Sequence, residues 1–108
     1  MKVPEDFDFK QRLRESDEEG DAEEWAEDNG WFTRPMQYRG RRGCPDRMFV
    51  GHGHLILAEF KKPDVRNKKD GGLSGNQVEE RKRFKAAGIF IPVFYTAAEC
   101  IAYLKRKM

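Results

Sequence analysis

Residues 54–61 constrain the fold more than any other segment of the chain. They read HLILAEFK, and in an extended strand both faces of residues 55–60 are apolar apart from Glu59. A strand with two apolar faces is expected at the centre of a sheet. Burying the carboxylate of Glu59 there costs on the order of several kcal/mol unless a partner compensates its charge. The segment therefore predicts a central strand, and it raises the question of what compensates Glu59.

Helix caps, glycine turns and apolar runs divide the rest of the chain into further elements. Gly30 and Gly88 are helix stop signals, and the Gly-His-Gly run at 51–53 is a turn signal. Pro92 is expected to place the last strand at an edge of the sheet or at a bulge. In chain order these signals predict a helix over about 10–29, a strand within 31–39, strands over 46–50 and 54–61, a helix over about 75–87, a strand over 89–95 and a helix over 97–105. The order is that of an α/β fold, and the long step between the last two strands allows a parallel crossover.

The length of 108 residues fits one domain. We expect residues 1–14 to be a flexible N-terminal arm and residues 15–108 to form a single domain. No apolar run approaches the roughly 20 residues of a membrane span, and the charged N-terminus does not resemble a signal peptide. Cys44 and Cys100 fit no metal-binding spacing and no disulfide framework, so we expect two free thiols. These features predict a soluble, cytoplasmic protein that does not engage a membrane.

The charge of the chain is divided unevenly along its length. Residues 1–30 carry 12 acidic and 4 basic residues, whereas residues 31–108 carry 7 acidic and 17 basic ones. A net charge of −8 is therefore followed by one of +10. A basic body of this kind favours a polyanionic ligand such as nucleic acid, with a solvated basic surface as the alternative. The basic residues gather in two clusters: Arg39, Arg41, Arg42 and Arg47, and Lys61, Lys62, Arg66, Lys68 and Lys69.

Three charged side chains are expected to meet at one end of the sheet. Glu59 and Lys61 are two residues apart and therefore share one face of their strand. Asp46 opens the neighbouring strand of a hairpin whose turn lies near residue 52, so the hairpin brings Asp46 close to Glu59. Two carboxylates beside a cation suit a hard divalent metal such as Mg²⁺, together with water and phosphate oxygens. Two simpler interpretations stay open, a Glu59–Lys61 salt bridge and Asp46 as a turn cap after Pro45.

Four segments together resemble the VRR-NUC family of the PD-(D/E)XK nuclease superfamily. They are GCPDRMFV, LILAEFKKP, LSGNQVEERKRFKAAG and IPVFY, and the resemblance covers roughly residues 15–104. In it, Pro45-Asp46 corresponds to the PD element, residues 59–61 correspond to the ExK element, and Gln77 opens the following helix. The resemblance implies a PD-(D/E)XK nuclease core with the order helix, three strands, helix, strand, helix around a mixed central sheet.

The resemblance also implies roles for individual residues. Asp46 and Glu59 would be metal ligands, and the carbonyl oxygen of Phe60 would be a further one. Lys61 would be the catalytic lysine, and Gln77 would orient water, the lysine or phosphate. The implied cofactor is Mg²⁺, with Mn²⁺ able to replace it.

Two of the implied site positions have structural alternatives. The family has a glutamate on its first helix that completes the metal site, for which Glu19 is the first choice and Glu15 the second. A solvated acidic helix face explains Glu19 equally well. Gln77 fits a capping box with Ser74, which is by itself a sufficient reason for a glutamine at this position.

Basic residues near the expected site are the candidates for DNA contacts. Arg39, Arg41 and Arg42 come just before the PD element, and we add Arg47 and Lys62, with solvated loop charges as the alternative. The pair His52 and His54 invites a zinc interpretation, but no suitable third ligand follows and the pair lies at a turn far from Glu59.

The resemblance implies a Mg²⁺-dependent DNA endonuclease of the small, stand-alone bacterial or phage type. Such a protein would work in the cytoplasm of a bacterium or of a phage-infected host. By analogy it would act as a homodimer on branched DNA such as four-way (Holliday) junctions, as in DNA repair. One alternative is a nuclease-like module that binds nucleic acid without cleaving it. Another is an interaction protein that uses its acidic N-terminal segment as a partner surface.

Overall fold

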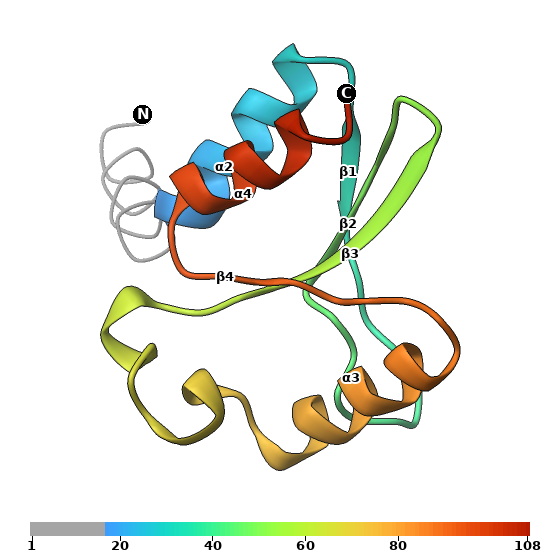
Figure 1. The fold of residues 1–108 in the computed structure, drawn as a ribbon, viewed down its shortest axis with the longest axis vertical. Helices are drawn as coiled ribbons and strands as arrows, with labels where there is room; N and C mark the ends of the chain where they lie inside the picture. The colour runs from blue at the N-terminus through green and yellow to red at the C-terminus, as the bar shows by residue number, and fades with distance from the viewer. Residues whose placement is uncertain (1–16) are drawn as a thin grey trace, which may run out of the picture.

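The computed structural model describes residues 17–108, which form a four-stranded sheet flanked by helices (Figure 1). Helices α2 and α4 lie side by side on one side of β4 in this view, and α3 lies on the other side. No helix within the described residues is long and apolar enough to cross a membrane. The elements are α2 (Asp17–Asp28), β1 (Phe32–Pro35), β2 (Arg47–Gly51), β3 (His54–Phe60), the 3₁₀ turns η1 (Pro63–Val65) and η2 (Lys69–Gly72), α3 (Gly75–Ala86), β4 (Val93–Phe94) and α4 (Ala97–Lys105).

The sheet has the strand order β1-β2-β3-β4, so β3 is an inner strand as its two apolar faces predict. β1, β2 and β3 are antiparallel neighbours, and β3 and β4 are parallel, which confirms the mixed sheet. The last strand is shorter than predicted, because only Val93 and Phe94 pair with β3. Pro92 has no N–H group to donate to a ladder, although its carbonyl accepts from the backbone N–H of Glu59 at 3.0 Å.

Helices α2 and α4 cover one face of the sheet and close the core. Ala22 and Ala26 of α2 are fully buried and form the inward face of this helix. They belong to one apolar cluster with Phe49 of β2 and with Cys100 and Leu104 of α4. Because β3 residues 56 and 58 join this cluster, the side chain of residue 59 points to the opposite face of the sheet.

The N-termini of α3 and α4 are capped by side chains. Ser74 and Gln77 form a complete capping box at the start of α3, as their spacing predicts. Thr96 accepts a hydrogen bond from the backbone N–H of Glu99 at the start of α4. The carboxylate of Glu18 on α2 also accepts from the backbone N–H of Ala97 at 2.6 Å. This contact joins the N-terminal ends of the two helices, which pack side by side, and stabilises the face that carries the core.

The basic segment between β3 and α3 was expected to be a loop, and it contains the two 3₁₀ turns η1 and η2. The hydroxyl of Tyr95 donates to the carbonyl of Gly71 at 2.7 Å. Arg66 pairs with the carboxylate of Glu99, and its guanidinium lies 4.5 Å from the centre of the Tyr95 ring. These contacts hold the segment against the end of β4.

Candidate active site

Asp46 and Glu59 lie next to each other at one end of β2 and β3. The backbone N–H of Asp46 donates to the carbonyl of Ala58 at 3.0 Å, which continues the β2–β3 pairing. The Oδ2 atom of Asp46 accepts a hydrogen bond from the backbone N–H of Phe60 at 2.8 Å. The hairpin therefore brings residue 46 beside residues 59 and 60, as the sequence spacing predicts.

The side chain of Glu59 is fully buried, on the face of β3 that is directed toward Gln77 of α3. Its Oε1 atom accepts from the amide of Gln77 at 3.3 Å, and its Oε2 atom has no hydrogen-bond partner among residues 17–108. Burial and the charge of Asp46 raise the pKa of Glu59 to about 8, against the opposing effect of Lys61 and Arg81. A buried carboxylate with a free oxygen atom is the strongest sign of a binding site in this fold.

Gln77 takes part in two sets of contacts at once. Its Oε1 atom accepts from the backbone N–H of Ser74 at 2.9 Å, and its backbone N–H donates to the hydroxyl of Ser74 at 3.1 Å. Its amide nitrogen donates to Glu59, so the cap of α3 also fixes the rotamer that reaches the buried carboxylate. The predicted capping box is therefore present, and Gln77 contacts Glu59 at the same time.

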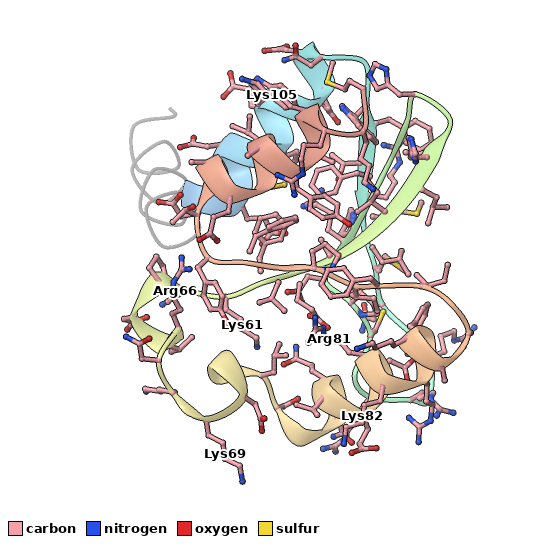
Figure 2. All side chains as sticks on the ribbon, viewed as in Figure 1. Lys61, Arg66, Lys69, Arg81, Lys82 and Lys105 are labelled. Atoms are coloured by element: carbon pink, nitrogen blue, oxygen red, sulfur yellow. The ribbon has the colours of Figure 1, made fainter. Side chains whose placement is uncertain are left out.

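Two cations lie beside the carboxylates, and only one of them was predicted. Lys61 follows β3 directly, and Figure 2 shows its side chain and that of Arg81 on the side of β3 and β4 that faces α3. Arg81 lies one helical turn after Gln77, and its Nε and Nη2 atoms donate to the carbonyl of Ile91 at 2.9 and 2.7 Å. The i, i+4 spacing of Gln77 and Arg81 is the sequence signal that places Arg81 on the same face of α3 as Gln77.

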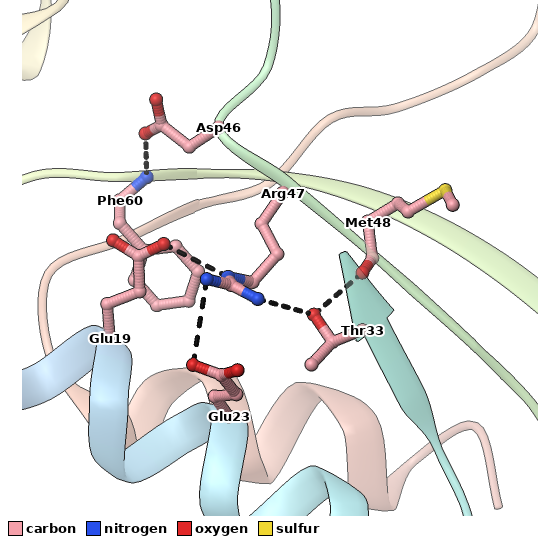
Figure 3. A network of polar contacts seen from close by, with 7 residues as sticks. All are labelled: Glu19, Glu23, Thr33, Asp46, Arg47, Met48 and Phe60. Carbon is pink, nitrogen blue, oxygen red and sulfur yellow. Dashed lines mark hydrogen bonds and ion pairs between the residues drawn. The ribbon is translucent and has the colours of Figure 1, made fainter. Parts of the chain in front are cut away.

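Arg47 was predicted to contact DNA, but its side chain is buried in a network of ion pairs and hydrogen bonds (Figure 3). Its side chain is 10% exposed, and it pairs with Glu19 at 3.0 Å and with Glu23 at 3.6 Å. Its Nη1 atom also donates to the hydroxyl of Thr33, which in turn donates to the carbonyl of Met48. A guanidinium that is buried and surrounded by these partners is not available to a phosphate group. We therefore remove Arg47 from the set of DNA contacts.

The carboxylate of Glu19 on α2 points toward the body of the fold and pairs with Arg47. Glu15, the second choice for the first-helix acid, lies outside the described residues. Among residues 17–108, no group of three or more His, Cys, Asp and Glu side chains is close enough to hold a metal ion. The role of Glu19 as a metal ligand stays a prediction.

Arg47→Gln is expected to lower the free energy of unfolding by about 2 kcal/mol, because Glu19 and Glu23 lose their cationic partner. Urea unfolding measures this loss, and Arg106→Gln, at an exposed position after α4, is the matched control. DNA affinity of the folded variant should equal that of the control. Weaker DNA binding with unchanged stability would restore Arg47 to the DNA-binding surface.

The other predicted DNA contacts are accessible. Arg39, Arg41, Arg42 and Lys62 are all exposed. His52, which was considered above as a possible zinc ligand, has a structural contact: its Nε2 atom lies 2.9 Å from the carbonyl oxygen of Asn29.

Both cysteines are free, as expected. Burial raises the pKa of both thiols, and that of Cys100 reaches about 12. Both are therefore protonated near neutral pH and are poor candidates for a nucleophile.

The residues at the site fit a hard divalent cation. Mg²⁺ is commonly bound by one or two carboxylates, with water and substrate phosphate oxygens as its remaining ligands. Asp46 and Glu59 supply two carboxylates whose like charges disfavour each other without a cation between them. The Oε2 atom of Glu59 is buried without a hydrogen-bond partner within residues 17–108, which is the state that a cation would relieve.

The arrangement of the helices and strands defines the fold of the domain. The chain has a VRR-NUC nuclease fold, which confirms the predicted α/β core with its mixed sheet. One similar solved structure is described as "VRR_NUC domain". It aligns with a TM-score of 0.68 and 24% sequence identity, over 81% of this chain and 89% of the other. No protein-family model matches the chain, and no curated protein matches it in sequence.

Proposed function

We propose that the protein is a Mg²⁺-dependent endonuclease that hydrolyses phosphodiester bonds in DNA. The observation that carries this proposal is the buried side chain of Glu59, whose Oε2 atom has no hydrogen-bond partner within residues 17–108, beside Asp46 and within the electrostatic influence of Lys61. A purely structural salt bridge would not leave a buried oxygen without a hydrogen bond. The VRR-NUC fold of the similar solved structure agrees with this chemistry.

Asp46, Glu59 and the carbonyl of Phe60 are the proposed ligands of the cation. Mg²⁺, or Mn²⁺ in its place, would supply positive charge that stabilises the negative charge developing on the scissile phosphate. Glu19 stays the proposed first-helix acid, with Glu15 as the second choice. Glu19 pairs with Arg47 on the α2 face of the sheet, so it would have to leave this ion pair and reach past the end of the strands to join Asp46 and Glu59.

Lys61 and Gln77 are the proposed residues that act on water and phosphate. The ammonium group of Lys61 would orient the attacking water and stabilise charge in the transition state. Gln77 is fixed by the cap of α3 and holds Glu59 in one rotamer, which keeps the carboxylate in place before substrate arrives.

The exposed basic residues are the proposed contacts to the DNA backbone. Arg39, Arg41, Arg42 and Lys62 would bind phosphate groups, so binding should depend strongly on salt and weakly on base sequence. We further propose branched or four-way-junction DNA as the preferred substrate, a homodimer as the active species, and the cytoplasm of a bacterium or phage-infected host as its location. A two-fold dimer would present two active sites to symmetric strands of a junction.

Incubation with linear, flap and four-way-junction DNA tests this proposal. Each substrate is combined with Mg²⁺, Mn²⁺ or a chelator, and products are separated under denaturing conditions. We expect cleavage with either metal, none with chelator, and the fastest cleavage on the junction. Binding to all substrates without cleavage under any condition would favour the non-cleaving module. Neither binding nor cleavage would favour an interaction protein that uses its acidic N-terminal segment.

A further inference from the structure

The loop that precedes β2 is fastened to α3 by contacts at both of its ends. At one end, the hydroxyl of Tyr38 donates to the Oε2 atom of Glu80 at 2.6 Å, across 42 positions of sequence. At the other end, Gly43 has a φ of +91°, and a Cβ atom there would lie 2.5 Å from the carbonyl oxygen of Asn76. Only glycine allows this approach. The arginine-rich residues between these ends are therefore held against the helix.

Glu80 is the buried anchor of this arrangement. The residue is 6% exposed, and the hydrogen bond from Tyr38 is the main cause that lowers its pKa, so the carboxylate is ionised. Its Oε1 atom lies 3.3 Å from Nη1 of Arg83 and 3.9 Å from Nε of Arg41. The side chains of Arg83 and Arg41 are 60% and 56% exposed, so the two guanidinium groups reach from the buried anchor into solvent.

An open hollow of about 500 Å³ lies over this anchor. Each guanidinium carries five N–H donors, more than Glu80 can accept, so the two arginines keep donors for a ligand. One acidic residue, Glu79, also lines the hollow, but its carboxylate pairs with Lys82 at 3.3 Å. Figure 2 shows Lys82 on the outer side of α3. The hollow is therefore basic overall. Its lining residues are Gly40, Arg41, Arg42, Asn76, Glu79 and Arg83.

We propose that this hollow, which we call the α3 hollow, binds a phosphate group of the nucleic-acid backbone beside the catalytic centre, and that Tyr38 and Glu80 are its positioning residues. The proposal rests on the proposed function and specifies where the substrate strand runs. Helix α3 links the two places, because Gln77 contacts Glu59 while its neighbour Asn76, together with Glu79 and Arg83, lines the hollow. A phosphodiester offers oxygen acceptors that match the fork of guanidinium donors.

Arg83→Gln tests the hollow directly. Affinity for a fluorescent duplex is measured by anisotropy on the full chain, in chelator so that nothing is cleaved, at several salt concentrations. We expect about five- to tenfold weaker binding and a salt slope reduced by about one. Arg106→Gln removes the same charge at an exposed position that follows Lys105 in sequence, and Figure 2 shows Lys105 at the opposite end of the view from α3. This variant should change affinity by less than about twofold. Equal affinities and slopes for the two variants would overturn the proposal.

Inorganic phosphate at matched ionic strength serves as a second probe. It should compete with DNA on the parent protein and compete less on the Arg83→Gln protein. Loss of phosphate binding in this variant with unchanged DNA affinity would make the hollow a site for small anions and would overturn the backbone assignment.

Glu80→Gln separates a positioned site from a merely basic surface. It removes one negative charge, so a surface that acts only through net charge should bind DNA more tightly. If Glu80 positions Arg41 and Arg83, the variant should instead bind several-fold more weakly. Glu79→Gln removes the same charge from an exposed neighbour and is expected to tighten binding slightly. Tighter binding by both glutamine variants would refute the positioning role, and Tyr38→Phe repeats the test without changing the charge.

The DNA-binding tests of the α3 hollow and the cleavage test of the proposed function can fail independently. Cleavage by the parent protein with equal DNA affinity of the Arg83→Gln and Arg106→Gln proteins would refute the hollow alone. Weaker binding by Arg83→Gln together with a parent that never cleaves would refute the nuclease function alone.

Discussion

Glu59→Gln is expected to stabilise the metal-free protein at pH 8 by on the order of 2–3 kcal/mol. The folded state raises the pKa of Glu59 from its ordinary 4.5 to about 8, chiefly because the carboxyl is buried. At pH values between 4.5 and about 8, Glu59 is therefore ionised in the unfolded chain and protonated in the folded protein. The stability contributed by Glu59 is therefore complete below about pH 4.5 and is lost as the pH rises through 8. Glutamine has the same shape and no proton to lose.

Urea unfolding in chelator at about pH 5 and about pH 8 measures this effect. The free energy of unfolding of the variant should exceed that of the parent at the higher pH and be similar to it at the lower pH. Glu79→Gln, at an exposed position, should show no such pH-dependent gain. An equal difference in the free energy of unfolding between variant and parent at both pH values would mean that Glu59 is not the group that titrates. Added Mg²⁺ should stabilise the parent more than the Glu59→Gln protein.

Asp46→Asn is expected to slow DNA cleavage by about 100-fold or more and to weaken Mg²⁺ binding strongly. The amide oxygen of asparagine can still accept the backbone N–H of Phe60, so the fold should be kept while the charge is lost. Titration calorimetry with Mg²⁺ and single-turnover cleavage measure the two effects. The matched control is Asp64→Asn in η1, where the side chain is exposed. Unchanged metal affinity in Asp46→Asn would remove Asp46 from the site.

Local sequence patterns predicted those features of the fold that depend on neighbours in the chain. The two apolar faces of residues 54–61 predicted the inner strand, and the spacing of Ser74 and Gln77 predicted the capping box. The meeting of Asp46 and Glu59 followed from hairpin geometry, because a tight turn fixes which residues of its two strands face each other.

Contacts between distant segments were beyond sequence reasoning. Arg47 looked like one more exposed arginine of a basic cluster, but its partners Glu19 and Glu23 come from a helix that packs under β2. The hydrogen bond between Tyr38 and Glu80 likewise joins segments that only the complete fold brings together. A charge pattern shows how many cations a chain has, and tertiary packing decides which of them face solvent.

Single-turnover cleavage of junction DNA by the Lys61→Met protein, with Mg²⁺ and with chelator, tests the central claim most directly. Methionine keeps much of the length of lysine and removes the ammonium group that lies near Glu59. The parent protein and Lys105→Met, on helix α4 away from the site in Figure 2, are the references. We predict Mg²⁺-dependent cleavage by both references and a loss of about 100-fold or more in Lys61→Met, with DNA affinity reduced only modestly. Equal cleavage by Lys61→Met and Lys105→Met, or a parent protein that leaves DNA intact with Mg²⁺, would contradict the account.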